Sequence, residues 1–116
     1  MQATFIELPP FQRLREEYFD DQSFKDLQNE MMRDPVAGVV IQGAGGLRKI
    51  RYGDERRGKG KRGGLRVIYY WNDADNQFWL FAVYNKDQAN DLTVTQRKTL
   101  KQRLELEIKT RSVKND

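Results

Sequence analysis

The residues of this chain that could carry out chemistry are basic side chains and one phenol, near the ends of three apolar runs. Lys49 and Arg51 are two residues apart in LRKIRY, so in a β-strand both side chains lie on one face. Arg66 begins the run LRVIYYW, and Tyr84 and Lys86, again two apart, end the run FWLFAVYNK. If the three runs are neighbouring antiparallel strands, we expect the four cations to converge beside the phenol as a phosphate site.

Such a site suits the cleavage of RNA, because RNA carries its own nucleophile, the 2′-hydroxyl group. The protein must then position the chain, stabilise the charge that grows on the phosphoryl oxygens and assist proton transfer. Arginine stays protonated in proteins, so a role in proton transfer falls to Lys49 or Lys86 rather than to Arg51 or Arg66. The same cations could also bind a phosphate without cutting the chain, and their spacing leaves both interpretations open.

Other kinds of active site find little support in the residues. The chain has no His and no Cys, which excludes a histidine proton shuttle, disulfides and thiolate zinc sites. Gly53-x4-Gly58-Lys59 resembles a phosphate-binding loop, but Gly60 stands where Ser or Thr must hold magnesium, and a predicted strand follows where a helix is required. We therefore expect no nucleotide cofactor and no metal ion.

Hydrophobic periodicity predicts the elements that position these residues. Residues 3–8 predict a first strand, and two helical stripes follow it, one after Pro9-Pro10 and one after Asp20-Asp21. Three further strands are predicted at residues 47–52, 65–71 and 78–84, the last two joined by a hairpin turn. Their near-continuous apolar character is typical of strands covered on both faces, in the middle of a sheet.

A last helix is predicted after the capping box of Thr93 and Gln96, with Ser112 to Asp116 as a frayed end. The element order is β-α-α-β-β-β-α. It predicts an α+β fold in which helices pack on a small antiparallel sheet. The length of 116 residues fits one domain over residues 1–116.

Positive charge is concentrated in one part of the chain. Residues 41–70 hold nine Lys and Arg against two Asp and Glu, whereas residues 1–40 hold four against eight. All nine glycines lie between positions 38 and 64, many of them in the loop GDERRGKGKRGG. A basic block of this kind indicates a polyanionic partner. No signal peptide or run of 18 apolar residues is present, so we expect a cytoplasmic protein without membrane contact.

Three segments resemble a known family in their order and spacing: IQGAGGLRKIR, GKGKRGGLRVIYYW and YNKDQANDLTVTQRK. Together they resemble the RelE superfamily of toxins, and most closely its HigB branch, from bacterial type II toxin–antitoxin systems. The resemblance covers nearly the whole chain. It implies a RelE-like microbial ribonuclease fold and an endoribonuclease that cuts mRNA in the ribosomal A site. It further implies that cleavage passes through a 2′,3′-cyclic phosphate, needs no metal and inhibits translation.

The resemblance also implies roles for particular residues. The basic pair that the family has before its loop corresponds to Lys49 and Arg51, the arginine after the loop to Arg66, and the basic position after the third strand to Lys86. Some relatives place a tyrosine or histidine near the C-terminus for proton transfer; this chain has neither after Tyr84, which is the remaining candidate phenol. The residues expected to bind RNA and the ribosome are Arg48, Arg56, Arg57, Lys59, Lys61 and Arg62.

The partners implied by the resemblance are mRNA, the ribosome and a cognate antitoxin of the HigA type. Such an antitoxin carries a helix-turn-helix domain, neutralises the toxin and represses the shared operon. The expected complex is a higher-order hetero-oligomer and the expected free toxin a monomer. Two alternatives remain at the level of the sequence: a non-catalytic module that binds RNA or DNA, and an interaction protein whose partner is acidic.

Overall fold

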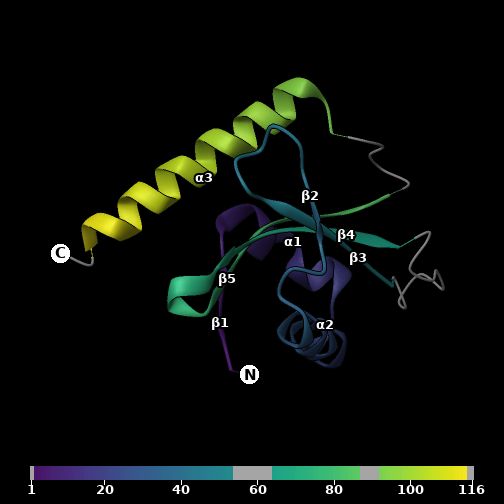
Figure 1. The fold of residues 1–116 in the computed structure, drawn as a ribbon. Coiled ribbons are helices and arrows are strands. Elements are labelled where there is room, and N and C mark those ends of the chain that lie inside the picture. Colours follow the sequence, from purple (N-terminus) through teal and green to yellow (C-terminus); the bar gives the residue numbers. More distant parts are fainter. Residues whose placement is uncertain (1, 54–63, 87–91, 115–116) are drawn as a thin grey trace.

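The computed structural model describes residues 2–53, 64–86 and 92–114 as a five-stranded sheet with helices packed against it (Figure 1). The sheet has the strand order β1-β5-β4-β3-β2. The elements in chain order are β1 (Thr4–Glu7), α1 (Pro9–Tyr18), α2 (Asp21–Arg33), β2 (Val39–Val40), β3 (Arg48–Tyr52), β4 (Leu65–Asn72), the 3-10 turn η3 (Asp73–Asp75), β5 (Gln77–Asn85) and α3 (Val94–Lys114).

The α+β class and the order of the predicted elements are confirmed, with three corrections. The sheet is mixed rather than antiparallel, because β1 pairs in parallel with β5. A parallel pair needs a long crossover, and α1, α2 and the other strands supply it here. The short strand β2 was not predicted, since two residues are too few for a periodic signal. Helix α3 does not fray at Ser112 but continues to Lys114, and its last turns include an ion pair of Arg111 with Glu107.

Helices α1 and α2 supply one apolar layer. The side chain of Asp20 accepts a hydrogen bond from the Ser23 backbone N–H at 2.7 Å, and Ser23 Oγ accepts one from the Asp20 N–H at 3.0 Å. This capping box starts α2 in the orientation that buries its apolar stripe. The buried layer consists of Phe11, Tyr18, Phe19, Phe24, Leu27 and Met31 against Ile50, Leu65, Val67, Tyr69, Phe78, Leu80 and Val83 of the sheet.

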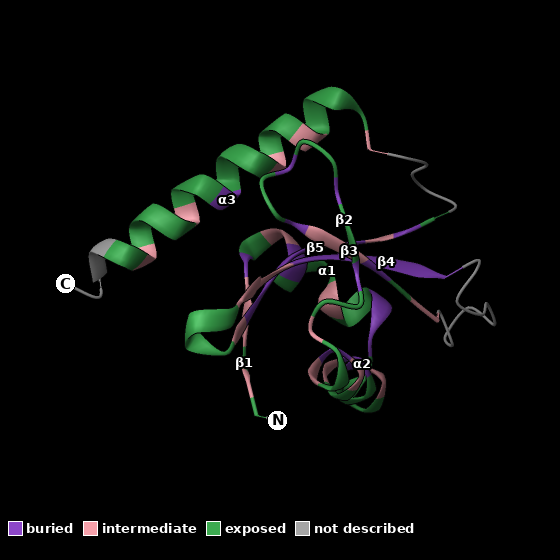
Figure 2. Cartoon of the chain, viewed as in Figure 1, coloured by how far each residue is buried: buried purple, intermediate pink, exposed green. Residues whose placement is uncertain are grey.

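Helix α3 covers the other face of the sheet, opposite α2 (Figure 1). The capping box predicted at its start is present: the Thr93 N–H donates to Gln96 Oε1 at 2.9 Å and the Gln96 N–H donates to Thr93 Oγ1 at 3.1 Å. Among its described side chains only Leu104 is buried, so most of the helix surface faces solvent (Figure 2). Leu104 packs with Ile41 and Trp79, among other residues of the second core cluster.

Tyr69 anchors the connection between α2 and β2. Its hydroxyl donates a hydrogen bond to the Pro35 carbonyl at 2.8 Å and accepts one from the Gly38 N–H at 3.1 Å. A Cβ atom at Gly38 would lie 2.8 Å from Tyr69 Cε1, so this close approach requires glycine. Burial raises the pKa of the Tyr69 hydroxyl above its ordinary value, because desolvation penalises the phenolate.

Among the described residues, no helix combines the length and the apolar character that crossing a lipid bilayer requires.

Candidate functional site

A row of three side chains crosses the middle of the sheet at the end nearest residues 53 and 64. The strand register pairs Arg51 of β3 with Arg66 of β4, and Arg66 with Tyr84 of β5. Residues directly opposite in antiparallel strands project from the same face, with Cβ atoms about 5 Å apart. That face is the one under α3, because Tyr84 packs against the same core cluster as Leu104. Two guanidinium groups and a phenol are therefore neighbours.

A β-bulge places Tyr84 in this row. Ile68 pairs with Ala82 and Tyr69 pairs with Leu80, which leaves Phe81 as the extra residue of β5. Bulges re-aim the side chains that follow them. Leu80 lies in the layer under α1 and α2, whereas Tyr84, an even number of residues further on, packs on the α3 side. Without the bulge, simple alternation would turn Tyr84 toward α1 and α2.

The two lysines of the predicted site lie on either side of this row. Lys49 is paired with Ile68, two residues from Arg51 along β3 and on the same face. Two residues of a strand span about 7 Å. Lys86 lies one residue beyond the end of β5, and its backbone N–H donates to the Gly64 carbonyl at 3.3 Å. The structure thus brings the five predicted catalytic positions to one end of the sheet.

Arg66 is the buried member of the group, with 6% of its surface exposed. Its Nη1 donates to the carbonyls of Gly64 and Leu65, each at 3.3 Å, and no carboxylate of the described residues pairs with it. A cation in these surroundings interacts strongly with an anion, because the effective dielectric is low.

Arg48 is not part of this group. It is paired with Tyr69, so it lies on the opposite face of β3 from Lys49. Its Nη1 donates to the carbonyls of Gly38 at 2.9 Å and Val36 at 3.3 Å. These hydrogen bonds stabilise the connection before β2. The other residues predicted to bind RNA, Arg56, Arg57, Lys59, Lys61 and Arg62, lie outside the described residues.

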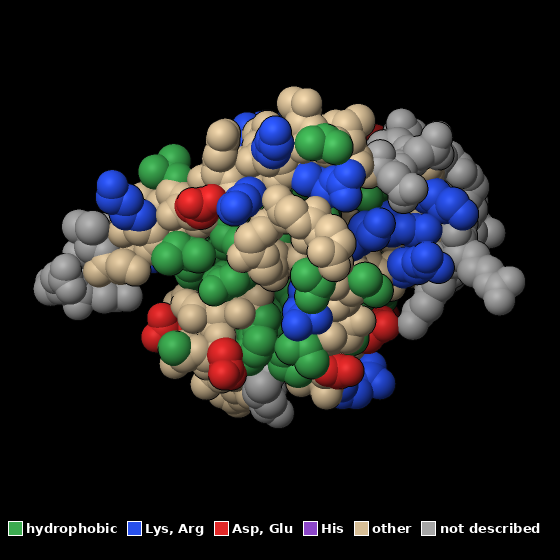
Figure 3. Space-filling model, turned by 45° about the horizontal axis from the view of Figure 1, so that its top comes forward, with side chains coloured by type: hydrophobic (Ala, Val, Ile, Leu, Met, Phe, Trp, Pro, Cys, Tyr) green, Lys and Arg blue, Asp and Glu red, His purple; other side chains and the backbone are tan. Residues whose placement is uncertain are grey.

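Basic side chains gather toward one end of the face seen in Figure 3. An apolar groove of about 560 Å³ runs beside the row, between α1, β5 and α3, and includes Tyr84 and Leu92 in its lining. A smaller cavity of about 270 Å³ adjoins it through Leu92 and contains Lys49 and Arg97. Arg97 was not predicted as a site residue, because the capping signal locates the start of α3 but not what the helix contacts.

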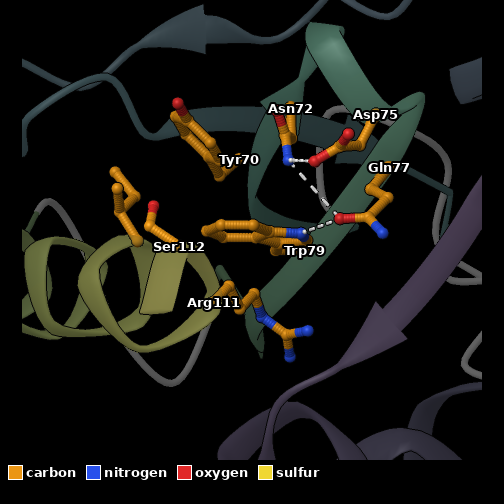
Figure 4. Close-up of a pocket in the computed structure, with 8 residues that line it drawn as sticks. Tyr70, Asn72, Asp75, Gln77, Trp79, Arg111 and Ser112 are labelled. Atoms are coloured by element: carbon orange, nitrogen blue, oxygen red, sulfur yellow. Dashed lines mark hydrogen bonds between the residues drawn. The ribbon is translucent and has the colours of Figure 1, made fainter. Parts of the chain in front are cut away.

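A third cavity, of about 620 Å³, lies at the other end of β4 and β5 under the last turns of α3 (Figure 4). Its polar groups largely bond one another: Trp79 Nε1 donates to Gln77 Oε1 at 3.0 Å, and Asn72 Nδ2 donates to Asp75 Oδ2 at 3.1 Å. The guanidinium of Arg111 lies 5.2 Å from the centre of the Trp79 ring.

Among the described residues, no group of three or more Asp and Glu side chains is arranged to hold a metal ion. No protein-family model matches the chain. Among solved structures, the chain is similar to a doubly substituted mutant of the E. coli toxin RelE in the free state. The two chains share 16% identity, the match covers 77% of this chain and 88% of that one, and the TM-score is 0.49. The site described above is defined by the geometry and charge of this chain alone.

Proposed function

We propose that this chain is the toxin of a bacterial type II toxin–antitoxin system, an endoribonuclease that cleaves mRNA in the ribosomal A site. The resemblance of its sequence to the RelE superfamily, and to the HigB branch within it, supports the proposal. The proposed partners are mRNA, the ribosome and a helix-turn-helix antitoxin of the HigA type, in the bacterial cytoplasm.

One observation carries the proposal furthest: Arg51 and Arg66 lie directly opposite each other in adjacent strands. Like charges in such a pair destabilise a sheet. No carboxylate of the described residues pairs with either guanidinium, and that of Arg66 is buried. Unfavourable pairs of this kind occur mainly at functional sites, where a ligand supplies the opposite charge that the protein lacks. A phosphodiester supplies it here.

In the proposed reaction, the 2′-oxygen of the nucleotide before the cut forms a bond to phosphorus. The bond from phosphorus to the 5′-oxygen of the next nucleotide breaks. One proton leaves the 2′-hydroxyl and one is added to the departing 5′-oxygen, so the products are a 2′,3′-cyclic phosphate and a 5′-hydroxyl end. Arg51 and Arg66 stabilise the charge on the non-bridging oxygens. Lys49 or Lys86 assists proton transfer, and Tyr84 adds a hydroxyl group beside Arg66.

Induced expression in bacteria, with growth and the 5′ ends of cellular mRNA as readouts, tests the proposal. Arg66→Gln should lower cleavage by about 100-fold or more, because one pre-oriented donor to the developing charge is lost. Lys86→Gln should also relieve growth arrest, and because Lys86 is exposed this variant should fold. Lys25→Gln, an exposed position on α2, is the control and should behave as the wild type.

Circular dichroism must first show that each variant is folded. Folded Arg66→Gln and Lys86→Gln proteins that cleave as well as the wild type would show that the site is elsewhere. A wild-type protein that binds RNA without producing new 5′ ends would instead be a binding module. A protein without affinity for nucleic acid at low salt would indicate an acidic protein partner.

A further inference from the structure

Among the residues that the structure describes, the cavity between β2, β3 and the start of α3 is lined by two cations and by no carboxylate. Its lining consists of Val39, Val40, Ile41, Gln42, Lys49, Leu92 and Arg97. The side chains of Lys49 and Arg97 are half-buried, and no described carboxylate pairs with either. Val39 and Val40 expose 73% and 43% of their surface. Two cations beside an exposed apolar wall suit a nucleotide, which has a charged phosphate and an apolar face of its base.

The cavity is continuous with the proposed cleavage site. Lys49 is paired across the sheet with Ile68, and Ile68, Leu92 and Tyr84 all line the adjoining groove. Along β3, Lys49 lies about 7 Å from Arg51, which belongs to the row around the scissile phosphate. An RNA strand that lies across the row can therefore continue into the cavity without leaving the surface of the sheet.

The charges of α3 give independent support. A helix N-terminus carries a partial positive charge, so cations near it are unfavourable. The first turn of α3 nevertheless has no acidic residue, and Arg97 and Lys98 follow directly. The acidic residues of α3, Glu105 and Glu107, lie in its second half. At the N-terminus of α3 this arrangement of charge is unfavourable, and an anion bound beside Arg97 offsets it.

We infer that Lys49 and Arg97 form a second phosphate subsite, which binds the phosphate of the nucleotide next to the scissile phosphodiester. The inference rests on the proposed function, and it refines that proposal. It assigns Lys49 to binding and leaves Lys86, two residues from Tyr84, for proton transfer. Arg97 is then a substrate-binding residue that belongs to α3, whereas the other proposed site residues lie in or next to the strands of the sheet.

The experiment measures binding separately from cleavage. The probe is a fluorescein-labelled single-stranded RNA with a 2′-deoxy sugar at the intended cut, which removes the nucleophile, followed by anisotropy from 50 to 300 mM salt. Arg97→Gln should weaken binding several-fold at 50 mM salt and lower the slope of log affinity against log salt by about 0.7, the value for one phosphate contact on a single strand. Arg97→Lys should restore most of the slope.

Lys98→Gln is the matched control, because it removes the same charge one position along α3, from an exposed residue that does not line the cavity.

On ribosomes programmed with a cleavable mRNA, Arg97→Gln should raise KM more than it lowers kcat. Equal changes in slope for Arg97→Gln and Lys98→Gln, or no binding by the wild type, would overturn the subsite. Binding that shows the expected slopes without any cleavage would support the subsite and refute the nuclease.

Discussion

At the scale of single residues, the two faces of the sheet differ in their role. One face carries the side chains of the proposed cleavage site, and the other carries side chains that stabilise the fold. On the α3 side, Arg51 and Arg66 form a cross-strand pair of like charge. On the other side, Arg48 and Tyr69 are also paired, but each bonds backbone groups of the connection between α2 and β2. Arg48 and Arg51 are three positions apart in β3 and therefore lie on opposite faces, one as a structural arginine and one as a proposed phosphate ligand. This difference predicts different outcomes of substitution.

Tyr69→Phe should lower the free energy of unfolding by about 1–3 kcal/mol at pH 8, because the Gly38 N–H and the Pro35 carbonyl lose their partner. The effect depends on pH. Since the pKa of Tyr69 is raised in the folded protein, its contribution is complete below the ordinary value of 10.0 and is lost as pH rises through the folded value. The difference between the two proteins should therefore narrow from pH 9 to pH 11. Urea denaturation followed by circular dichroism measures it, and a difference that stays constant over this range would contradict the assignment.

At the scale of elements, α3 is the helix with the weakest attachment and the one that carries Arg97. Its contact with the rest of the chain centres on Leu104, which is 1% exposed, while Leu106 is 64% exposed. A Cβ at Gly45 would lie 3.2 Å from Lys101 Cγ and 3.6 Å from Leu104 Cδ2, so the glycine-rich segment before β3 approaches the helix closely. The position of Arg97 in the cavity that it shares with Lys49 thus depends on how α3 docks.

Leu104→Ala should lower the free energy of unfolding by about 2–4 kcal/mol, because it leaves a cavity among Ile41, Leu47 and Trp79. It should also weaken RNA binding, since the helix that holds Arg97 is less firmly docked. Leu106→Ala is the matched control and should change stability by less than about 0.5 kcal/mol. Thermal unfolding and the anisotropy assay provide the measurements. Equal destabilisation by both substitutions would show that α3 docks through another face.

The elements differ in how well the sequence predicts them. The apolar stripe of Phe24, Leu27 and Met31 and the capping box at Thr93 are local signals, and the structure confirms both. The parallel pairing of β1 with β5 and the strand β2 depend on contacts between distant segments, which periodicity does not report. For the same reason the shared face of Lys49 and Arg51 could be predicted, whereas the approach of Arg97 to Lys49 could not.

At the scale of the whole molecule, positive charge is concentrated in the part of the sequence that includes β3 and the start of β4. Residues 41–70 contribute a net charge of +7, while residues 1–40, which form α1 and α2, contribute −4. A distribution of this kind steers a polyanion to one side of the protein, and the attraction weakens as salt screens it.

Neutralising two lysines of the basic loop, Lys59→Gln with Lys61→Gln, should therefore make cleavage of ribosome-bound mRNA less sensitive to salt. If both lysines contact phosphates of single-stranded RNA, the slope of log affinity against log salt should fall by about 1.4. The control pair is Lys25→Gln with Arg33→Gln on α2, which removes the same charge from the helix on the face of the sheet opposite α3. Cleavage rates at 50 to 300 mM salt give the comparison, and a slope unchanged by the loop substitutions would refute a role in RNA attraction.

The extra residue in β5 changes which positions of that strand lie on the same face of the sheet. In an unbroken strand, two side chains share a face only when an even number of positions separates them. Trp79 and Tyr84 are five positions apart and yet lie on the same side. With the odd separation found here, the two side chains share a face only because the bulge adds one residue between them. A homologue that lacks the extra residue needs an even separation to keep its tyrosine on the side of the arginines.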